Sequence, residues 1–120
     1  MKFTVVTSNE NKAREVAAFF EGVAEVAHTF LEIPEYRDND VGVIAEEKAR
    51  YAWNALRCPL IVDDTGFFVA ALNGFPGPYA AYVLDTIGME GILCLVEGAE
   101  DRSAYFETAI AYADSEGTIR

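Results

Sequence analysis

A short apolar strand that runs directly into two carboxylates is the feature that most restricts how this chain can fold. Residues 60–62 are Leu, Ile and Val, and Asp63, Asp64, Thr65 and Gly66 follow without a break. Acidic side chains at the end of a buried strand cost free energy unless they bind a partner. Adjacent strand residues point to opposite faces, so we expect one carboxylate to face a crevice at the strand end, where open α/β sheets hold ligands. A carboxylate there suits Mg²⁺, and an aspartate turn closed by Gly66 is the alternative.

Composition narrows the classes of function. The 120 residues carry 20 acidic and 9 basic side chains, a formal net charge of −11, which argues against a broad basic surface for nucleic acid. One histidine and two cysteines without Cys-x-x-Cys spacing indicate neither a disulfide framework nor a zinc site. No apolar run reaches membrane-spanning length and residues 1–7 are too short for a secretory signal. We therefore expect a cytoplasmic protein without a membrane or nucleic-acid partner.

Hydrophobic periodicity predicts strands and helices in a single domain over residues 1–120. Strands are expected over residues 3–6, 23–31, 60–62, 67–72 and 103–114, and helices over residues 10–20, 43–57, 79–87 and 90–97. Residues 114–117, Asp-Ser-Glu-Gly, predict a hairpin turn, and three residues follow it. We expect a domain truncated at its C-terminus, with one edge of the last strand left for a partner chain or a further part of the protein.

A second candidate site lies where the first strand meets the first helix. A helix N-terminus gathers main-chain N–H groups and a positive dipole end at one point, which suits a phosphate. Polar side chains there can add donors: the segment is Thr7, Ser8, Asn9, Glu10, Asn11 and Lys12. A simple helix cap is the alternative.

Glu35 and Lys48 are the third candidate. A proline stiffens the loop that presents Glu35, although an ordinary surface glutamate is the simpler interpretation. Lys48 is one of only three lysines, and we expect it to face inward, where an ammonium needs an anion. The expectation rests on a helical face that Lys48 shares with Ile44, Tyr51 and Ala55. A salt bridge to one of the acids is the alternative to a phosphate.

Together these motifs resemble those of the Ham1-like inosine triphosphate pyrophosphatase family, in its archaeal form. The matching segments are Thr-Ser-Asn-Glu-Asn-Lys at 7–12, Pro-Glu-Tyr at 34–36, Pro-Leu-Ile-Val-Asp-Asp-Thr-Gly at 59–66 and Ala-Leu-Asn-Gly-Phe-Pro-Gly-Pro-Tyr at 71–79. The resemblance covers nearly the whole chain and corresponds to the N-terminal portion of the family. It implies an α/β fold with a long mixed β-sheet flanked by helices, and two lobes around a cleft.

The resemblance also implies an activity and a set of roles. The activity is Mg²⁺-dependent hydrolysis of ITP, dITP and XTP to monophosphate and pyrophosphate, which cleanses the nucleotide pool, by a homodimer. Residues 7–12 and Lys48 would bind the triphosphate, and Thr65 and Gly66 would contact the substrate. Glu35 and Asp64 would hold Mg²⁺, and Asp64 would accept a proton from the attacking water.

Two departures limit what the resemblance implies. Ala81 stands where many relatives carry Lys or Arg, so one phosphate contact is expected to be missing or to come from an arginine such as Arg102. The segments that contact the base in relatives follow position 120, so base preference is not implied for this chain. The alternative function is a catalytically weak nucleotide- or Mg²⁺-binding fragment, or an assembly partner of a full-length copy.

Overall fold

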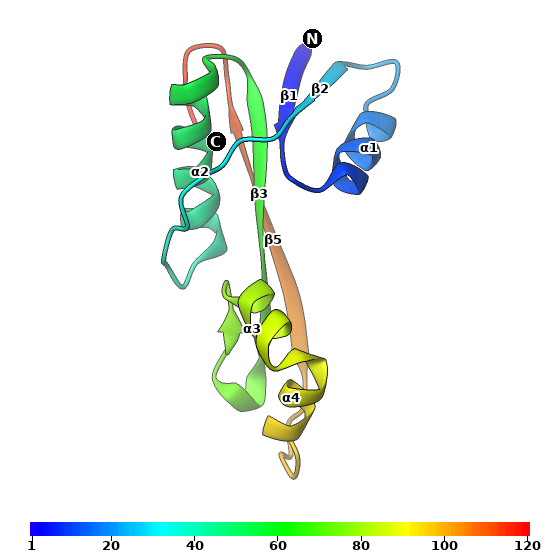
Figure 1. The fold of residues 1–120 in the computed structure, drawn as a ribbon, viewed down its shortest axis with the longest axis vertical. Helices are drawn as coiled ribbons and strands as arrows, with labels where there is room; N and C mark the ends of the chain where they lie inside the picture. Colours follow the sequence, from blue (N-terminus) through cyan, green and yellow to red (C-terminus); the bar gives the residue numbers. More distant parts are fainter.

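The computed structural model describes all 120 residues, which form a five-stranded mixed sheet flanked by helices (Figure 1). The elements are β1 (Lys2–Val6), α1 (Glu10–Phe19), β2 (Glu25–Thr29), α2 (Val41–Leu56), β3 (Leu60–Val69), a 3₁₀ turn (Ala70–Leu72), β4 (Pro76–Gly77), α3 (Ala80–Thr86), α4 (Gly88–Leu95) and β5 (Ala104–Ala113). The predicted α/β class is confirmed. None of the helices has the length and hydropathy that crossing a membrane requires.

β3 is the spine of the sheet. β5 pairs antiparallel with all ten residues of β3 along one edge. On the other edge, β1 runs parallel to the start of β3 as far as Ile61, and β4 runs antiparallel to it from Phe67 onward. Between Ile61 and Phe67 this edge has no neighbouring strand, so the sheet has a gap in its middle.

Two hydrophobic cores lie at opposite ends of β3 and form two lobes. The first core joins α2 to β1, β3 and β5 and consists of Val6, Ala45, Ala49, Ala52, Leu60, Val62, Ala111 and Ala113. The second lies under α3 and α4 and consists of Phe67, Val69, Ala80, Val83, Ile92 and Val96. Figure 1 shows β3 and β5 running through both lobes of a molecule that measures 51 × 27 × 22 Å. The predicted two-lobed architecture is therefore confirmed.

Side chains fix the starts of the first two helices. Asn9 Oδ1 accepts the N–H of Lys12 at 3.1 Å, and Asp40 Oδ1 accepts the N–H of Gly42 at 2.7 Å. Such caps satisfy main-chain donors that have no partner inside the helix. The Asn9 cap places Lys12 in the first turn of α1, next to the end of β1.

The sequence prediction for the middle of β3 is wrong. Residues 63–66 were expected to end one strand and residues 67–72 to form another, but β3 is continuous from Leu60 to Val69 and residues 70–72 form a 3₁₀ turn. The strand continues through Asp63 and Asp64 because lysines of two helices compensate their charges. The alternative of an aspartate turn closed by Gly66 is wrong for the same reason.

The inward face of α2 also differs from the prediction. Lys48 does face the sheet, with 27% of its side chain exposed, but Tyr51 and Ala55 are exposed. The buried positions are instead Val41, Ile44, Ala45, Ala49 and Ala52. Three alanines let the helix approach β3 and β5 closely, and a tyrosine does not fit at that distance.

The predicted hairpin turn follows β5. Asp114 Oδ1 accepts the N–H groups of Glu116 and Thr118, and Tyr112 and Arg120 exchange two main-chain hydrogen bonds of 2.9 Å. Before Tyr112, the outer edge of β5 is paired with no strand, as expected from the sequence.

Gly117 holds this hairpin against Trp53, and we expect Gly117→Ala to lower the melting temperature by several degrees. Gly117 has φ +85°, and a Cβ there would lie 2.9 Å from Trp53 Cε2. A left-handed conformation alone costs a non-glycine residue about 1–2 kcal/mol, and the steric conflict adds to it. Thermal unfolding can be followed by the fluorescence of Trp53, the one tryptophan of the chain.

Gly98→Ala is the matched control for that prediction. Gly98 has φ +80°, and a Cβ there would meet no atom within 4 Å. This variant is therefore destabilised by the left-handed backbone conformation alone, without a steric conflict with Trp53. Equal losses of melting temperature in the two variants would contradict the role assigned to the Trp53 contact.

Candidate active site

A cleft of about 1160 Å³ opens at the gap in the sheet edge. Its walls are the β1–α1 turn, the β2–α2 connection, one side of α2, the middle of β3 and the start of α3. Eight of the predicted site residues line it: Thr7, Ser8, Asn9, Lys12, Glu35, Lys48, Asp64 and Thr65. The structure thus brings together segments that lie far apart in the sequence.

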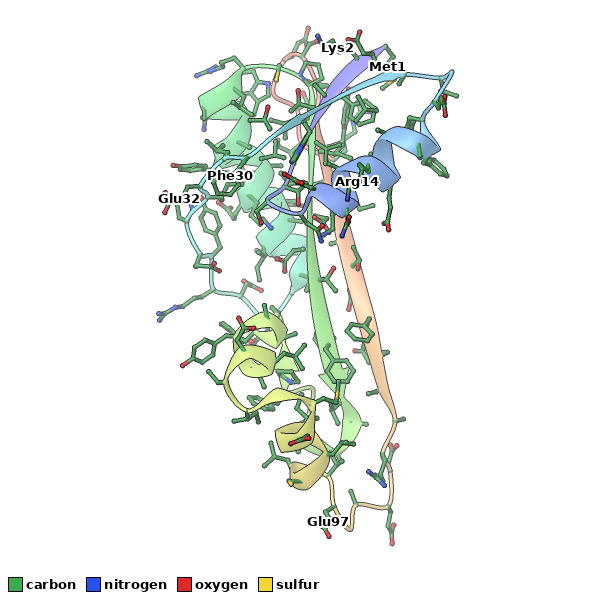
Figure 2. The ribbon with its side chains drawn as sticks, turned by 45° about the vertical axis from the view of Figure 1, so that its right-hand side comes forward. Met1, Lys2, Arg14, Phe30, Glu32 and Glu97 are labelled. Carbon is green, nitrogen blue, oxygen red and sulfur yellow. The ribbon has the colours of Figure 1, made fainter.

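The connection between β2 and α2 forms one rim of the cleft. Figure 2 shows this segment, marked by Phe30 and Glu32, crossing from the side of α1, marked by Arg14, to the side of α2. Phe30, Glu32 and the following Glu35 all line the cleft. The long connection between the end of β2 at Thr29 and the start of α2 at Val41 is therefore part of the site.

Three predicted site residues do not line the cleft. Glu10 is exposed outside it, and Asn11 accepts a hydrogen bond from Arg14 Nη2 on the outer side of α1. Gly66 is buried, and a Cβ there would lie 2.6 Å from the ring of Phe68. Gly66 therefore permits close packing inside the sheet.

Asp63 and Asp64 take their partners from helices on opposite faces of β3. Lys12 Nζ of α1 donates to Asp63 Oδ2 at 2.5 Å, whereas Lys48 Nζ of α2 lies 3.7 Å from Asp64 Oδ1. This agrees with the predicted alternation of the two side chains. The predicted salt bridge of Lys48 to an acid is present, and both lysines also line the cleft.

Lys48 also fills the main-chain gap in the sheet. The carbonyl of Pro59 accepts the N–H of Thr4 in β1, and main-chain groups alternate along a strand, so the carbonyl of Asp63 faces the same edge. No strand lies there to donate to it, and Lys48 Nζ does so instead, at 2.7 Å. One lysine thus binds a main-chain oxygen and stands beside a carboxylate.

Asp64 is the most perturbed carboxyl group of the cleft. Burial raises the pKa of Asp64, Lys48 opposes this rise, and the negative charges of Asp63 and Glu35 add to it. Only 19% of the Asp64 side chain is exposed, and its Oδ2 is buried without a hydrogen-bond partner. A carboxylate with one free oxygen can accept a proton or hold a cation.

The raised pKa predicts that Asp64→Asn stabilises the fold at neutral pH. When the pKa of an acid is higher in the folded than in the unfolded chain, the folded state becomes less stable as the pH rises from the lower pKa to the higher one. The amide removes this penalty, so we expect the variant to melt a few degrees above the parent at pH 7. The difference should vanish below the ordinary aspartate pKa of about 3.9, where both states are protonated.

Asp114→Asn is the control of opposite sign. Hydrogen bonds from the main-chain N–H groups of Thr118 and Glu116 lower the pKa of Asp114, so its charge favours the folded state above the ordinary pKa. This variant should melt below the parent at pH 7 and approach it as the pH falls through the lowered pKa. A pH-independent difference for Asp64→Asn would contradict the assignment.

The donor set of the cleft fits Mg²⁺. No group of three or more His, Cys, Asp or Glu side chains surrounds a common point. Mg²⁺ needs only one or two protein carboxylates, because it keeps waters and phosphate oxygens as its other ligands. The unpartnered Oδ2 of Asp64 and the carboxylate of Glu35 in the same cleft meet that requirement.

The β1–α1 turn has the structure of a helix cap. Thr7 Oγ1 accepts the N–H of Asn9, and Asn9 Oδ1 accepts the N–H of Lys12. The cap interpretation is thus confirmed for Asn9. The turn also lines the cleft beside Lys12, so its position is compatible with phosphate binding. Phosphate binding by Thr7, Ser8 and Lys12 stays a prediction.

Sequence reasoning missed several residues of the cleft. Tyr79 and Tyr82, which are expected from the sequence to be ordinary helix-face aromatics, line it together with Arg37. Ala81 lines it as well, whereas Arg102, expected as a substitute cation, does not. Arg102 lies two residues before β5, at the far end of the second lobe, so the structure does not support the alternative that it replaces the missing cation. Arg37 could have been found from the sequence, because it stands two residues after Glu35, which was already assigned to the site.

Comparison with known proteins decides the family. A profile described as the Ham1 family matches residues 3–120. The chain belongs to the Ham1 family. It is 46% identical over 117 residues to a protein of Saccharolobus solfataricus and 45% identical over 120 residues to one of Methanopyrus kandleri, both named dITP/XTP pyrophosphatase. The alignments cover 95% and 98% of the chain but 60% and 63% of these relatives, so the chain spans less than two thirds of their length.

Solved structures of Ham1 proteins share the fold. A nucleoside-triphosphatase, dITP/XTP pyrophosphatase, from Mycobacterium abscessus superposes with a TM-score of 0.81 at 27% identity and covers 100% of this chain and 68% of its own. The Staphylococcus aureus Ham1 protein superposes with a TM-score of 0.83 at 23% identity, and covers 100% of this chain and 67% of its own. This chain therefore shares its fold with about two thirds of each of these Ham1 proteins.

Proposed function

We propose that this chain carries the phosphate-binding and catalytic residues of a nucleoside triphosphate pyrophosphohydrolase. The substrates are non-canonical purine nucleotides, ITP, dITP and XTP, and the products are the monophosphate and pyrophosphate. One observation carries the proposal: Asp64, which has one buried carboxylate oxygen without a partner, lines a cleft that two lysines also line. The names of the two relatives at 45–46% identity support the substrate class.

The lysines and the start of α1 bind the phosphates. Lys12 and Lys48 bring two positive charges to one cleft in a chain of net charge −11. Thr7 and Ser8, at the end of β1, add hydroxyl groups beside the N-terminus of α1. These groups recognise the triphosphate and leave the base to other parts of the cleft.

Asp64 and Glu35 hold the metal ion. When bound, Mg²⁺ would neutralise charge on the phosphate oxygens and so make the phosphorus more open to attack. Glu35 lies at the rim, on the β2–α2 connection, and Asp64 lies at the floor, on β3. The low local count of acidic ligands leaves most coordination positions for phosphate and water.

Asp64 also accepts the proton of the attacking water. The water oxygen bonds to the α-phosphorus, the bond from that phosphorus to the bridging oxygen breaks, and pyrophosphate leaves. The raised pKa of Asp64 makes its carboxylate a stronger base than an exposed aspartate. Lys48 Nζ lies 3.7 Å from Asp64 Oδ1, which leaves Oδ2 as the carboxylate oxygen without a partner.

We further propose a cytoplasmic homodimer that clears the nucleotide pool. Large apolar side chains are exposed on β5, among them Tyr105, Phe106 and Ile110, which supports burial against another chain. Sedimentation velocity over a range of concentrations measures the oligomeric state. A monomer at all concentrations would contradict the dimer and leave the catalytic proposal intact.

The test of the function is product analysis with ITP and Mg²⁺. We expect stoichiometric IMP and pyrophosphate, with little orthophosphate. Orthophosphate as the first product would contradict the proposal, because it places the attack at the γ-phosphorus. Binding of ITP without turnover would favour the alternative of a weak nucleotide-binding fragment.

A further inference from the structure

Asp63 has no part in the proposed chemistry, yet it contacts both lysines of the cleft. Its Oδ2 accepts a hydrogen bond from Lys12 Nζ at 2.5 Å, and its main-chain oxygen accepts one from Lys48 Nζ at 2.7 Å. The two lysines come from α1 and α2, which lie on opposite faces of β3. A single residue therefore connects a helix on one face of β3 with a helix on the other.

We propose that Asp63 is a positioning residue that holds Lys12 and Lys48 together for one polyphosphate chain. The inference rests on the proposed function, because it assumes that these lysines bind phosphate. Asp63 stands at the gap between β1 and β4, where its main-chain oxygen is free of any strand. At this position the side chain binds Lys12 from one face of the sheet, and the main-chain oxygen binds Lys48 from the other.

Pre-ordering of the lysines is the physical gain. A lysine carries its ammonium on a flexible four-carbon stem, and fixing that stem costs conformational entropy. The Lys12–Asp63 pair is half-buried, with side-chain exposures of 39% and 20%. The pair fixes the ammonium before a ligand arrives, so binding pays less of the ordering cost.

The third lysine shows that such ordering is particular to the cleft. Lys2 lies 3.8 Å from Glu25, and their side chains are 65% and 74% exposed. Exposed pairs of this kind contribute little to stability and leave both side chains mobile. The Lys2–Glu25 pair is therefore the natural reference for the Lys12–Asp63 pair.

Charge alone predicts the opposite effect from positioning. A carboxylate beside a phosphate site repels the anion, so replacing it by an amide should strengthen binding if Asp63 contributed only its charge. If Asp63 positions the lysines, the same replacement weakens binding. The sign of the affinity change therefore separates the two roles.

The experiment is calorimetric titration of the 120-residue chain with inorganic tripolyphosphate. This probe needs neither a base nor turnover. We expect Asp63→Asn to weaken binding about fivefold, because the ligand must then order the Lys12 side chain and ordering one long side chain costs about that factor. Asp63→Glu keeps a carboxylate within reach of Lys12 and should bind between the parent and Asp63→Asn. Glu25→Gln makes the same acid-to-amide change in the Lys2 pair and should leave affinity unchanged.

A double-mutant cycle tests whether Asp63 acts through Lys12. Lys12→Ala should cost less affinity in the Asp63→Asn background than in the parent, because the amide has already released the ammonium. Equal costs in both backgrounds would overturn the proposal, as would unchanged or tighter binding by Asp63→Asn. Absence of tripolyphosphate binding by the parent would instead contradict the proposed phosphate site itself.

A measurement on the parent covers the case in which Asp63→Asn does not fold. In ¹H–¹⁵N spectra of the lysine ammonium groups, Lys12 and Lys48 should give signals with slow hydrogen exchange, and Lys2 should not. Fast exchange at all three lysines in the free protein would overturn the proposal.

Discussion

Asp64→Asn is expected to reduce the release of pyrophosphate from ITP by about a thousandfold, the size of a lost general base. The amide keeps the shape of the side chain, and its oxygen can still stand beside Lys48 Nζ, which lies 3.7 Å from Asp64 Oδ1. It cannot take the proton of the water, and it is a weaker ligand for a divalent cation. The measurement is kcat/KM with saturating Mg²⁺, on protein whose melting curve shows that it is folded.

Glu107→Gln is the matched control for the loss of activity. Glu107 lies on β5 opposite Gly66, near the same part of β3, and it is exposed outside the cleft. It makes the same change from acid to amide and should retain the activity of the parent. Turnover by Asp64→Asn within a few-fold of the parent would contradict the role of Asp64 as base. A melting temperature of this variant at or above that of the parent would exclude unfolding as the cause of a loss.

Local patterns were sufficient to predict most helices and strands. α1, predicted over residues 10–20, spans Glu10–Phe19, and the last strand, predicted over residues 103–114, spans Ala104–Ala113. Caps such as Asn9, apolar periodicity and the turn at residues 114–117 act over a few residues, so they are visible in the sequence. Lys48 and Asp64, which form an ion pair in the structure, could also be assigned to the site from the family motifs.

The continuity of β3 could not be predicted because its cause is not local. Two aspartates, a threonine and a glycine favour a turn on propensity alone. The strand persists because Lys12 and Lys48, distant in the sequence, compensate the two charges. The cleft likewise depends on where β1 ends and β4 begins along the same edge, which is a property of strand register.

The inward face of α2 shows a second limit of sequence patterns. Tyr51 and Ala55 have the helical spacing of an apolar stripe, and so do the residues of α2 that are buried in the structure. The choice between the stripes depends on the distance between α2 and the sheet, and small residues at positions 45, 49 and 52 set that distance. Hydrophobicity alone does not show that the smallest side chains are the most buried.

Replacing Lys12 or Lys48 is expected to have the second large effect, on the affinity for ITP. Lys12→Ala and Lys48→Ala are each expected to weaken the binding of ITP about tenfold or more, and the double variant about a hundredfold or more. Both ammonium groups line one cleft, so each loses contacts with the same phosphate chain. Lys2→Ala removes the remaining lysine, which is 65% exposed beside Glu25, and should leave the affinity unchanged. Titration calorimetry in Ca²⁺ instead of Mg²⁺ can measure binding with slow turnover.

The pH dependence of activity distinguishes the two lysines from each other. The positive charge of Lys48 lowers the pKa of Asp64, whereas the ammonium of Lys12 pairs with Asp63. We therefore expect Lys48→Ala to move the acidic limb of the kcat/KM profile to higher pH, because the base then ionises later. Lys12→Ala should weaken binding without moving that limb, since its ammonium pairs with Asp63 on the other face of β3. Identical shifts in the two variants, or a shift with Lys2→Ala, would contradict the assignment of Asp64 and Lys48 as a coupled pair.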